Sequence, residues 1–544
     1  MVWDPGIMTM GASRDAIKVN ATDVEDLPDG CGMHAAFKVR RRLRAVDWQI
    51  RYSDIPPFAL GVVRDVAIAL HSDDRTSTFA GLRAAMVERL DRHALHPGVR
   101  RWAEHSVESY LDAHEELAAD TGPLRFLMKD PATGSNSRYV SAWAPMYGDG
   151  GGLREIRRLR FGPARSVGPV IGQWAATAAY VAAFTPPCGA LTRIRVVEVG
   201  LLDGSTSVLF DGTPEAARAA YEANARPAIA TFLDATSQIP GRACGGCKIA
   251  GCCPAPETVD GHLGQDQPGI RTRSVSASDL ETYARCPAQW HMRDSNLPKD
   301  VGAHPAAARG RNVHAWLRAA HGRGVKCELS DMPEPGTGTE AFAGLDDAEY
   351  AAAYPYLLAH LGECPFGPAV KVIALDQPLY GYDRPADVVV ATRPDLFMID
   401  ADGVPVLHET KTTEEALPSN EAEAFDRWFH VPWLISLFAS GSGARLGATE
   451  AGVVELEVLT PGGGRTYAWR LDDDPVVRMA RAEVRARADD WHRDSVWEAR
   501  PGPQCGWCPV SRWCPSAGRA SADAVPSVAM HDEPEMPVDD DPPF

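Results

Sequence analysis

The sequence of 544 residues contains no apolar run long enough to cross a membrane. The apolar stretch AATAAYVAAF at residues 175–184 falls far short of the roughly 18 residues that a spanning helix needs. The first residues, MVWDPGIMTMGASRD, also lack the basic segment and the following apolar segment of a secretory signal. We therefore expect no membrane segment and a cytoplasmic location.

Basic residues are in deficit, and the formal net charge is −18. This balance argues against a protein that binds nucleic acid through a generally basic surface, although only the local field of a groove acts on a phosphate. Two local basic stretches remain, KVRRRLR at residues 38–44 and a group of arginines further along the chain: Arg154, Arg157, Arg158, Arg160 and Arg165. They are either phosphate-binding surfaces or solvated faces paired with nearby acids.

A nucleotide-driven motor has no motif in this sequence. The segment GPVIGQW at residues 168–174 lacks the lysine and the Ser/Thr of the loop that cradles nucleotide phosphates, and no other segment supplies them. We expect any unwinding of a duplex to come from a separate helicase.

Cysteine occurs in a repeated pattern. Twelve cysteines in a cytoplasmic chain are expected to stay reduced, so clustered ones indicate metal binding. The spacing C-x2-C-x5-C-P occurs twice, at residues 244–254 and 505–515. Each copy has one cysteine far upstream, Cys31 and Cys286, in the similar contexts ATDVEDLPDGC and SASDLETYARC. The pattern predicts two homologous units.

The repeat sets the predicted domain boundaries. A single hydrophobic core rarely extends beyond about 250–300 residues, so a chain of this length needs at least two. We assign residues 21–255 and 274–518 to the two units and the Pro/Gly-rich, polar residues 256–273 to a linker. Residues 1–20 are assigned to an N-terminal tail and residues 519–544 to a disordered acidic tail.

A segment of the second unit carries residues suited to catalysis. Residues 388–413, VVVATRPDLFMIDADGVPVLHETKTT, are typical of two strands joined by a turn. A turn centred on Asp402 places Asp395 opposite Glu409, and strand alternation places Lys411 on the face of Glu409. Two carboxylates suit a hard cation such as Mg²⁺, which beside a lysine can activate water for phosphodiester hydrolysis. Taken alone, the three side chains are also explained as solvated charges at strand ends.

Four motifs in order give the second unit a family resemblance. They are SVSASDLETYARCPAQW (274–290), RGRNVHAWL (309–317), PD…ETK (394–411) and the cysteine triplet at 505–514. Together they resemble the PD-(D/E)xK nuclease superfamily, specifically RecB-like and CRISPR-associated exonucleases with an iron–sulfur cluster. The resemblance implies an α/β fold of two tandem domains, each a mixed central sheet flanked by helices and clasped by a four-cysteine metal cluster.

The resemblance also implies roles for single residues. Asp395 and Glu409 would bind Mg²⁺ or Mn²⁺, with His314 and the carbonyl of Thr410 as further ligands. Lys411 would orient the attacking water and stabilise charge on the phosphate. The Gln-x-x-x-Tyr helix of the family has no counterpart after the lysine, so the placement of substrate stays open. Without the family, His314 reads as a residue of an amphipathic helix.

The cysteines of the second unit supply four thiolates: Cys286, Cys505, Cys508 and Cys514. Four thiolates suit Zn²⁺ and a [4Fe-4S] cluster alike, and the resemblance favours the iron–sulfur cluster, in a structural role. A second cluster in the first unit would use Cys31, Cys244, Cys247 and Cys253, with Cys252 as an alternative ligand. Cys31 is otherwise a buried apolar residue. Three cysteines have no metal-like spacing, and we expect them to be core or surface thiols: Cys188, Cys327 and Cys364.

The first unit lacks the catalytic residues when it is laid on the second. Three positions differ: Met146 replaces Asp395, Asp65 replaces His314, and Glu155 with Arg157 replaces the E-x-K pair. One carboxylate holds Mg²⁺ poorly, so we predict that this unit is catalytically inactive, with at most a weak site between Asp65 and Glu155. It would still serve to bind DNA.

The last residues, DEPEMPVDDDPPF, resemble the acidic tip of bacterial single-stranded-DNA-binding proteins. In those proteins the final aromatic residue and its carboxylate enter a basic-rimmed pocket on repair proteins. The resemblance implies a repair protein as a partner, while a purely solubilising tail remains the alternative.

These features predict a metal-dependent DNA nuclease, acting as an exonuclease on single strands or ends in repair, recombination, or phage and defence processing. Two alternatives remain open. One is a non-catalytic iron–sulfur scaffold that binds DNA. The other is a nuclease subunit that is active only with a partner helicase.

Overall fold

A computed structural model describes residues 7–9, 17–25, 30–40, 43–45, 58–71, 79–135, 138–166, 168, 170–187, 189–233, 235–266, 273–300, 305–332, 347–367, 369–443 and 452–519. Within these ranges, no helix combines the length and the apolar character needed to cross a bilayer. The predicted acidic tail from residue 520 onward, together with Cys188, Arg41 and Arg42, lies outside them.

The first half of the chain is built on a five-stranded sheet in the order β10-β9-β8-β7-β4. Its strands are β4 (Arg125–Met128), β7 (Met146–Gly148), β8 (Leu153–Arg160), β9 (Arg193–Gly200) and β10 (Thr206–Gly212). Only the pair β8 and β9 is parallel. The helices are α1 (Ala21–Glu25), α2 (Gly32–Lys38), α3 (Ala59–His71), α4 (Phe79–Leu90), α5 (Pro97–Thr121), α6 (Gln173–Phe184), α7 (Pro214–Ala220) and α8 (Arg226–Leu233). Helices α3 and α5 pack on one face of the sheet and α6 on the other.

The second half has a sheet in the order β13-β16-β17-β18-β19. Its strands are β13 (Lys371–Leu375), β16 (Leu396–Ile399), β17 (Pro405–Thr412), β18 (Val453–Thr460) and β19 (Gly463–Arg470). The helices are α9 (Ala277–Arg285), α10 (Pro287–Asp294), α11 (Pro305–His321), α12 (Asp347–Glu363), α13 (Glu421–Arg427), α14 (His430–Phe438) and α15 (Asp474–Arg493). Helices α14 and α15 share the main core with one face of the sheet, and α11 and α12 cover the other. The expectation of a mixed sheet flanked by helices is confirmed for both halves.

The two five-stranded sheets have the same strand order and the same strand directions. Counted from its first strand in the sequence, the first sheet is β4-β7-β8-β9-β10, which corresponds to β13-β16-β17-β18-β19 in the second. In the second half β17 and β18 are again the parallel pair, and the remaining neighbours are antiparallel. A smaller sheet accompanies each half. In the first it has the order β2-β6-β5, formed by β2 (Ile17–Asn20), β5 (Ala132–Ser135) and β6 (Arg138–Ser141). In the second it has the order β11-β14-β15-β12, formed by β11 (Glu257–Thr258), β12 (Arg273–Val275), β14 (Leu379–Asp383) and β15 (Val388–Thr392).

The segments predicted to be a tail and a linker contribute to these sheets. Strand β2 extends the small sheet of the first half by parallel pairing with β6. Strand β1 (Ile7–Thr9) pairs with β3 (Leu43–Ala45). Within the predicted linker, β11 pairs with β14, and His262 is fully buried against Ser436 of α14. The described part of the linker is therefore packed against the second half.

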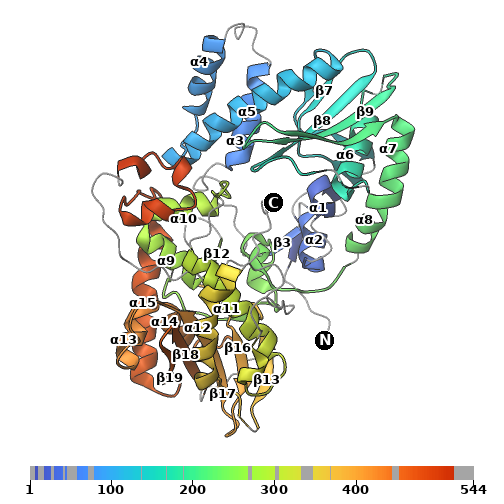
Figure 1. Ribbon diagram of the computed structural model, residues 1–544. Helices are drawn as coiled ribbons and strands as arrows, with labels where there is room; N and C mark the ends of the chain where they lie inside the picture. Colours follow the sequence, from blue (N-terminus) through green and yellow to red (C-terminus); the bar gives the residue numbers. More distant parts are fainter. Residues whose placement is uncertain are drawn as a thin grey trace.

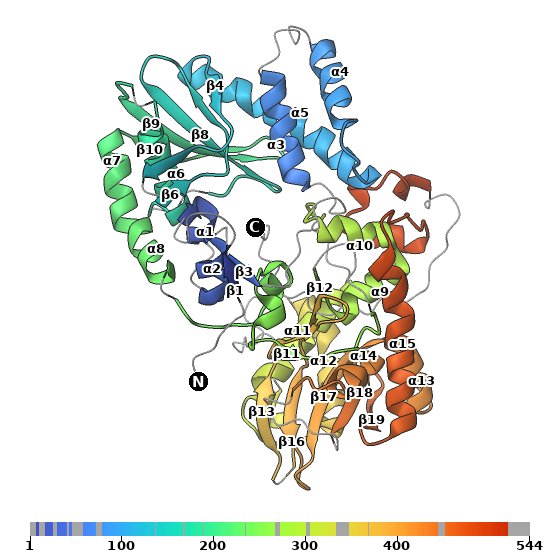
Figure 2. The same ribbon diagram turned by 180° about the vertical axis from the view of Figure 1, so that it is seen from behind.

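The two halves are joined through their cysteine-rich segments (Figures 1 and 2). Two short 3-10 helices near the C-terminus, η7 (Pro503–Trp507) and η8 (Ser511–Trp513), lie beside α10 and the start of α5. One hydrophobic cluster runs from α5 to Met292, Val510 and Trp513. In return, η2 (Arg242–Gly246) of the first half contacts β12 and β15 of the second. Each cysteine segment thus packs against the opposite half.

Candidate active site

The β16–β17 hairpin has the register that the sequence predicts. Leu396 pairs with His408, so the turn is centred on Asp402. The turn is fixed by the side chain of Asp400, whose Oδ1 accepts hydrogen bonds from the backbone N–H groups of Asp402 at 2.9 Å and Val404 at 2.7 Å. Gly403 has a φ of 82°, in the left-handed region that glycine adopts without steric cost. The predicted register is confirmed, and it leaves the residue before β16 opposite Glu409.

That residue is Asp395, and its carboxylate joins three elements of the fold. Oδ1 lies 2.8 Å from Nδ1 of His314, which α11 supplies. Oδ2 accepts a hydrogen bond of 2.8 Å from the backbone N–H of Thr410 in β17. On the same strand, Nζ of Lys411 donates to Oε1 of Glu409 at 3.0 Å. The structure therefore brings the five predicted residues of this site together at one end of the hairpin.

The four charged side chains of this site are shielded from solvent. Those of Glu409 and Lys411 are each 6% exposed, and those of His314 and Asp395 are 15% and 22% exposed. Burial alone would raise the pKa of Asp395, but the neighbouring His314 and Lys411 outweigh it and lower that pKa. Burial would likewise lower the pKa of His314, and the carboxylate of Asp395 raises it instead. The surroundings of Asp395 therefore favour its ionised carboxylate, the form that binds a cation.

The opposite face of β17 carries a second buried network. Because side chains alternate along a strand, His408 and Thr410 point away from the face of Glu409 and Lys411. Both contact Glu457 of β18: Oγ1 of Thr410 donates to Oε2 at 3.0 Å, and Nε2 of His408 lies 3.4 Å from the same oxygen. Glu457 is fully buried. Sequence reasoning missed this network, because Glu457 lies in an ordinary-looking strand far along the chain.

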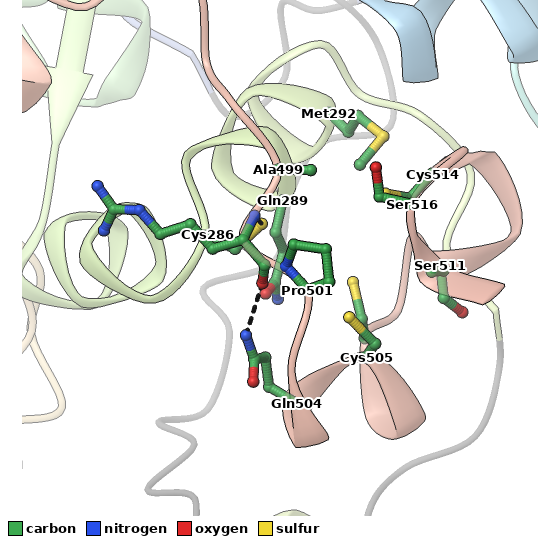
Figure 3. Close-up of a pocket in the computed structure, with 13 residues that line it drawn as sticks. Cys286, Gln289, Met292, Ala499, Pro501, Gln504, Cys505, Ser511, Cys514 and Ser516 are labelled. Atoms are coloured by element: carbon green, nitrogen blue, oxygen red, sulfur yellow. Dashed lines mark hydrogen bonds between the residues drawn. The ribbon is translucent and has the colours of Figure 1, made fainter. Parts of the chain in front are cut away.

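Four cysteines of the second half surround one pocket (Figure 3). Cys286 comes from the junction of α9 and α10, and the other three come from the C-terminal segment: Cys505, Cys508 and Cys514. Burial, together with the three neighbouring thiols, raises the pKa of Cys508 to about 11. Such thiols stay protonated until a metal displaces the protons. The pocket also includes Gln289 and Met292 of α10, so it lies where the first and last segments of this half meet.

The first-half cysteines are also neighbours. Cys31 precedes α2, and its sulfur accepts a hydrogen bond from the backbone N–H of His34 at 3.4 Å. Burial raises the pKa of Cys247 to about 12, with further contributions from the thiols of Cys244, Cys253 and Cys31. The structure thus gathers the four cysteines of the predicted second cluster.

The counterparts of Glu409 and Lys411 in the first half differ from those predicted. Glu155 and Arg157 lie on the face of the sheet that α5 covers, as the contact between Arg157 and His114 of α5 shows. Helix α5 directly precedes β4, the edge strand of this sheet. The equivalent face in the second half belongs to His408 and Thr410. The residues on the matching face of β8 are therefore Ile156, paired with Met146, and Arg158. The predicted alignment of Glu155 with the E-x-K motif is wrong by one residue. Successive side chains of a strand point to opposite faces of the sheet, so this shift places Glu155 and Arg157 on the wrong face.

The predicted weak site between Asp65 and Glu155 also has no geometric support. Oδ2 of Asp65 lies 2.7 Å from Nζ of Lys129, at the surface. Glu155 is fully buried and is paired with Arg157 at 2.7 Å and Arg195 at 2.9 Å. The two carboxylates thus belong to different sites.

The arginine group of β8 is mostly interior. Arg157 is fully buried, and Arg154 and Arg158 are 6% and 8% exposed. Arg158 forms an ion pair of 2.7 Å with Glu25 of α1, and Arg160 lies 3.6 Å from Glu198. The interpretation of this group as a phosphate-binding surface is therefore wrong for these four: carboxylates pair with Arg157, Arg158 and Arg160, and Arg154 donates to backbone carbonyl groups instead. Arg165 alone among the five is exposed.

The structure brings together a further group of side chains of the metal-binding types, which the spacing of cysteines in the sequence did not predict. The ligand atoms of His321, Cys327, His360 and Cys364 all lie within 4.8 Å of one another. Cys327 and Cys364 belong to a hydrophobic cluster, in keeping with the expectation of core or surface thiols, and they also lie beside two histidines. The only sequence signal was the pair of intervals His321 to Cys327 and His360 to Cys364, each a histidine followed closely by a cysteine.

Comparison with known proteins finds a family match for the second half of the chain. No curated protein matches the sequence. Among the solved structures that match, one titled "Crystal structure of SSO0001" is 14% identical, with 45% of this chain and 86% of that chain covered and a TM-score of 0.22. Residues 274–515 match the family model described as the PD-(D/E)XK nuclease superfamily. The segment that carries Asp395, Glu409 and Lys411 is therefore a domain of the PD-(D/E)XK nuclease superfamily.

Proposed function

We propose that this domain is a metal-dependent deoxyribonuclease that hydrolyses phosphodiester bonds, as a RecB-like exonuclease on single-stranded DNA or on ends. The observation that carries the proposal is the meeting of His314, Asp395, Glu409 and Lys411 in one shielded site. These residues lie inside the segment that matches the nuclease family model.

The donor set of the site suits Mg²⁺ or Mn²⁺. Asp395 and Glu409 supply carboxylate oxygens from opposite positions of one hairpin, and His314 adds an imidazole within 2.8 Å of the first carboxylate. The carbonyl of Thr410 is the proposed fourth protein ligand. When bound, a divalent ion of this kind supplies a Lewis acid that polarises the phosphate and eases deprotonation of water.

The side chains of the site would then divide the remaining work. Lys411 donates a hydrogen bond to Glu409, so its ammonium is held at the same edge as the two carboxylates. From there it would orient the attacking water and stabilise negative charge that develops on the phosphate. The hydrogen bond from Thr410 to Asp395 fixes the second carboxylate oxygen, which keeps the carboxylate in one orientation.

We propose a structural [4Fe-4S] cluster for the pocket of Cys286, Cys505, Cys508 and Cys514. These sulfurs surround a pocket and do not form a tight group like that of His321 and its neighbours, which suits a cluster better than a single ion. A second cluster is proposed for Cys31, Cys244, Cys247 and Cys253.

The first half is proposed to be a degenerate copy of the nuclease domain, with a role in DNA binding. Its sheet has the same order and directions as that of the second half, which supports a tandem origin. Ile156 and Met146 are apolar where a cation would need carboxylates. Strand separation is assigned to a partner helicase, because the chain has no phosphate loop.

The decisive test is cleavage of end-labelled single- and double-stranded DNA by anaerobically purified protein with Mn²⁺ or Mg²⁺. The proposal expects cleavage by the wild type and by Asp402→Asn, an exposed turn residue of the same hairpin, but none by Asp395→Asn. Equal cleavage by Asp395→Asn would refute the assignment. If the wild type binds DNA without cutting it, and Lys411→Ala binds equally well, the chain is a scaffold. Cleavage that requires an added helicase favours the subunit alternative.

A further inference from the structure

Two histidines and two cysteines converge at a place separate from the proposed nuclease site. His321 is the last residue of α11, and Cys327 lies in the segment that follows this helix. His360 lies in the last turn of α12, and Cys364 comes directly after the helix ends. The four residues therefore tie together the ends of two helices that pack against each other.

The geometry of this group is that of a single-ion site. Nε2 of His321 lies 3.1 Å from Nε2 of His360, and the backbone N–H of Cys327 donates to Sγ of Cys364 at 3.3 Å. The four ligand groups are buried, and their ligand atoms all lie within 4.8 Å of one another. A tetrahedral Zn²⁺ ion with nitrogen ligands at about 2.0–2.1 Å and sulfur ligands at about 2.3 Å separates its ligand atoms by roughly 3.3–3.8 Å. The 3.1 Å between the two imidazole nitrogens and the 4.8 Å limit for the whole group lie on either side of these separations, so only small side-chain shifts are needed.

A second observation points to a metal independently of this spacing. Nδ1 of His360 lies 2.6 Å from Oε1 of Glu457, a fully buried carboxylate. A histidine that gives its Nδ1 proton to a carboxylate presents the lone pair of Nε2, and metal-binding histidines are usually oriented by such a partner. Here Nε2 is the atom that faces His321. Without an ion, two imidazole nitrogens would face each other beside two thiols.

We propose that His321, Cys327, His360 and Cys364 bind one Zn²⁺ ion. Two thiolates and two imidazoles select zinc over the Mg²⁺ or Mn²⁺ of the nuclease site, which prefer oxygen ligands. Protein side chains fill all four positions, so no position remains for water or substrate, and the site is structural.

The zinc site supports the nuclease site through two connections. His321 follows His314 by seven residues on α11, which is about two helical turns, so the two histidines lie on the same side of one helix. Glu457, which orients His360, also accepts the hydrogen bond from Oγ1 of Thr410. The ion would therefore fix the helix that carries His314 and buttress the strand that carries Glu409 and Lys411.

Zinc and iron content of the full-length protein, measured by mass spectrometry after anaerobic purification, tests the proposal without reference to nuclease activity. The expected result is about one zinc per chain in the wild type and a loss of at least tenfold in the double variant Cys327→Ser, Cys364→Ser. The matched control is Cys505→Ser, Cys508→Ser, which is expected to lose iron and keep the zinc. Zinc that is absent from the wild type, or that leaves with Cys505 and Cys508 instead, would overturn the assignment.

X-ray absorption at the zinc edge of the wild-type protein keeps the proposal testable if the first double variant does not fold. It should show two sulfur ligands at about 2.3 Å and two nitrogen ligands at about 2.0–2.1 Å. A shell of four sulfurs would place the zinc in a four-cysteine pocket and refute the proposal. A disulfide between Cys327 and Cys364, detected by mass mapping of the unreduced protein, would refute it as well.

Discussion

The carboxylate of Asp395 lies 2.8 Å from Nδ1 of His314, although the two residues are far apart in the sequence. Helix α11 and the β16–β17 hairpin meet at this pair, and the backbone of Thr410 holds the other oxygen of Asp395. A metal-binding role and an acid–base role for His314 make different predictions. Loss of a metal ligand raises the metal concentration that cleavage requires, whereas loss of an acid–base group lowers the maximal rate. The nuclease site can therefore be tested residue by residue.

Replacement of His314 by Ala should shift the metal requirement. Asp395 would keep its bond to Thr410 but lose the neighbouring imidazole, so we expect at least a tenfold rise in the Mn²⁺ concentration that gives half-maximal cleavage. A titration of cleavage rate against Mn²⁺ measures this. His93→Ala, a change in the segment that follows α4, is the control and should leave the titration curve unchanged. A fall in maximal rate at an unaltered midpoint would contradict the ligand role.

Lys411→Met should abolish most cleavage while preserving binding. The ammonium is proposed to stabilise charge on the phosphate, and removal of one such group costs about 10²–10³ in rate. Glu409 would lose the hydrogen bond from Lys411 but would remain available to a cation. Single-turnover cleavage and a DNA-binding titration separate the two effects. Lys371→Met on the exposed side of β13 is the matched control, and a similar loss of rate in both variants would remove the special role of Lys411.

The hairpin and its site were predictable because the signals were local. The turn chemistry of Asp400 to Gly403 and the alternation of the flanking strands fixed the pairing of Leu396 with His408. The two cysteine triplets were recognisable in the same way, because the repeated C-x2-C-x5-C spacing lies within a short segment of sequence. The first-half alignment failed because one strand position decides the face of every side chain, so an error of one residue moved Glu155 and Arg157 from one face to the other. The group around His321 depends on two helices and a strand, and no short motif records it.

Glu457→Leu should strongly destabilise the second half. This buried carboxylate contacts His360, His408 and Thr410, and removing it takes one partner from each of these buried polar groups. Breaking a buried charged network by removing one member typically costs 3–5 kcal/mol, so we expect a loss of about that size in urea unfolding. Glu455→Gln, which alters a partly exposed contact of His408, should cost much less. Equal stability of Glu457→Leu and the wild type would show that the network contributes nothing.

The first half should lose stability in mild acid through a buried histidine pair. His71 packs against His114 with ring centroids 3.8 Å apart, and Tyr110, Tyr147 and Arg157 face the same cluster. Burial, together with the nearby His114 and Arg157, lowers the pKa of His71 to about 3. The pKa of His114 is lowered to about 4, again by burial and by Arg157. Both rings therefore stay neutral in the folded state at a pH where the unfolded chain binds protons.

The sign of the effect follows from this difference. An unfolded histidine has a pKa of about 6.5, so stability is full above that pH and falls as the pH drops toward 4. At pH 5 the expected loss from His71 is about 2 kcal/mol relative to pH 7. Urea unfolding followed by a probe in the first half, at both pH values, measures it. His71→Gln cannot take up the proton, so its stability should fall less between the two values. An identical fall in the variant and the wild type would assign the acid sensitivity to other groups.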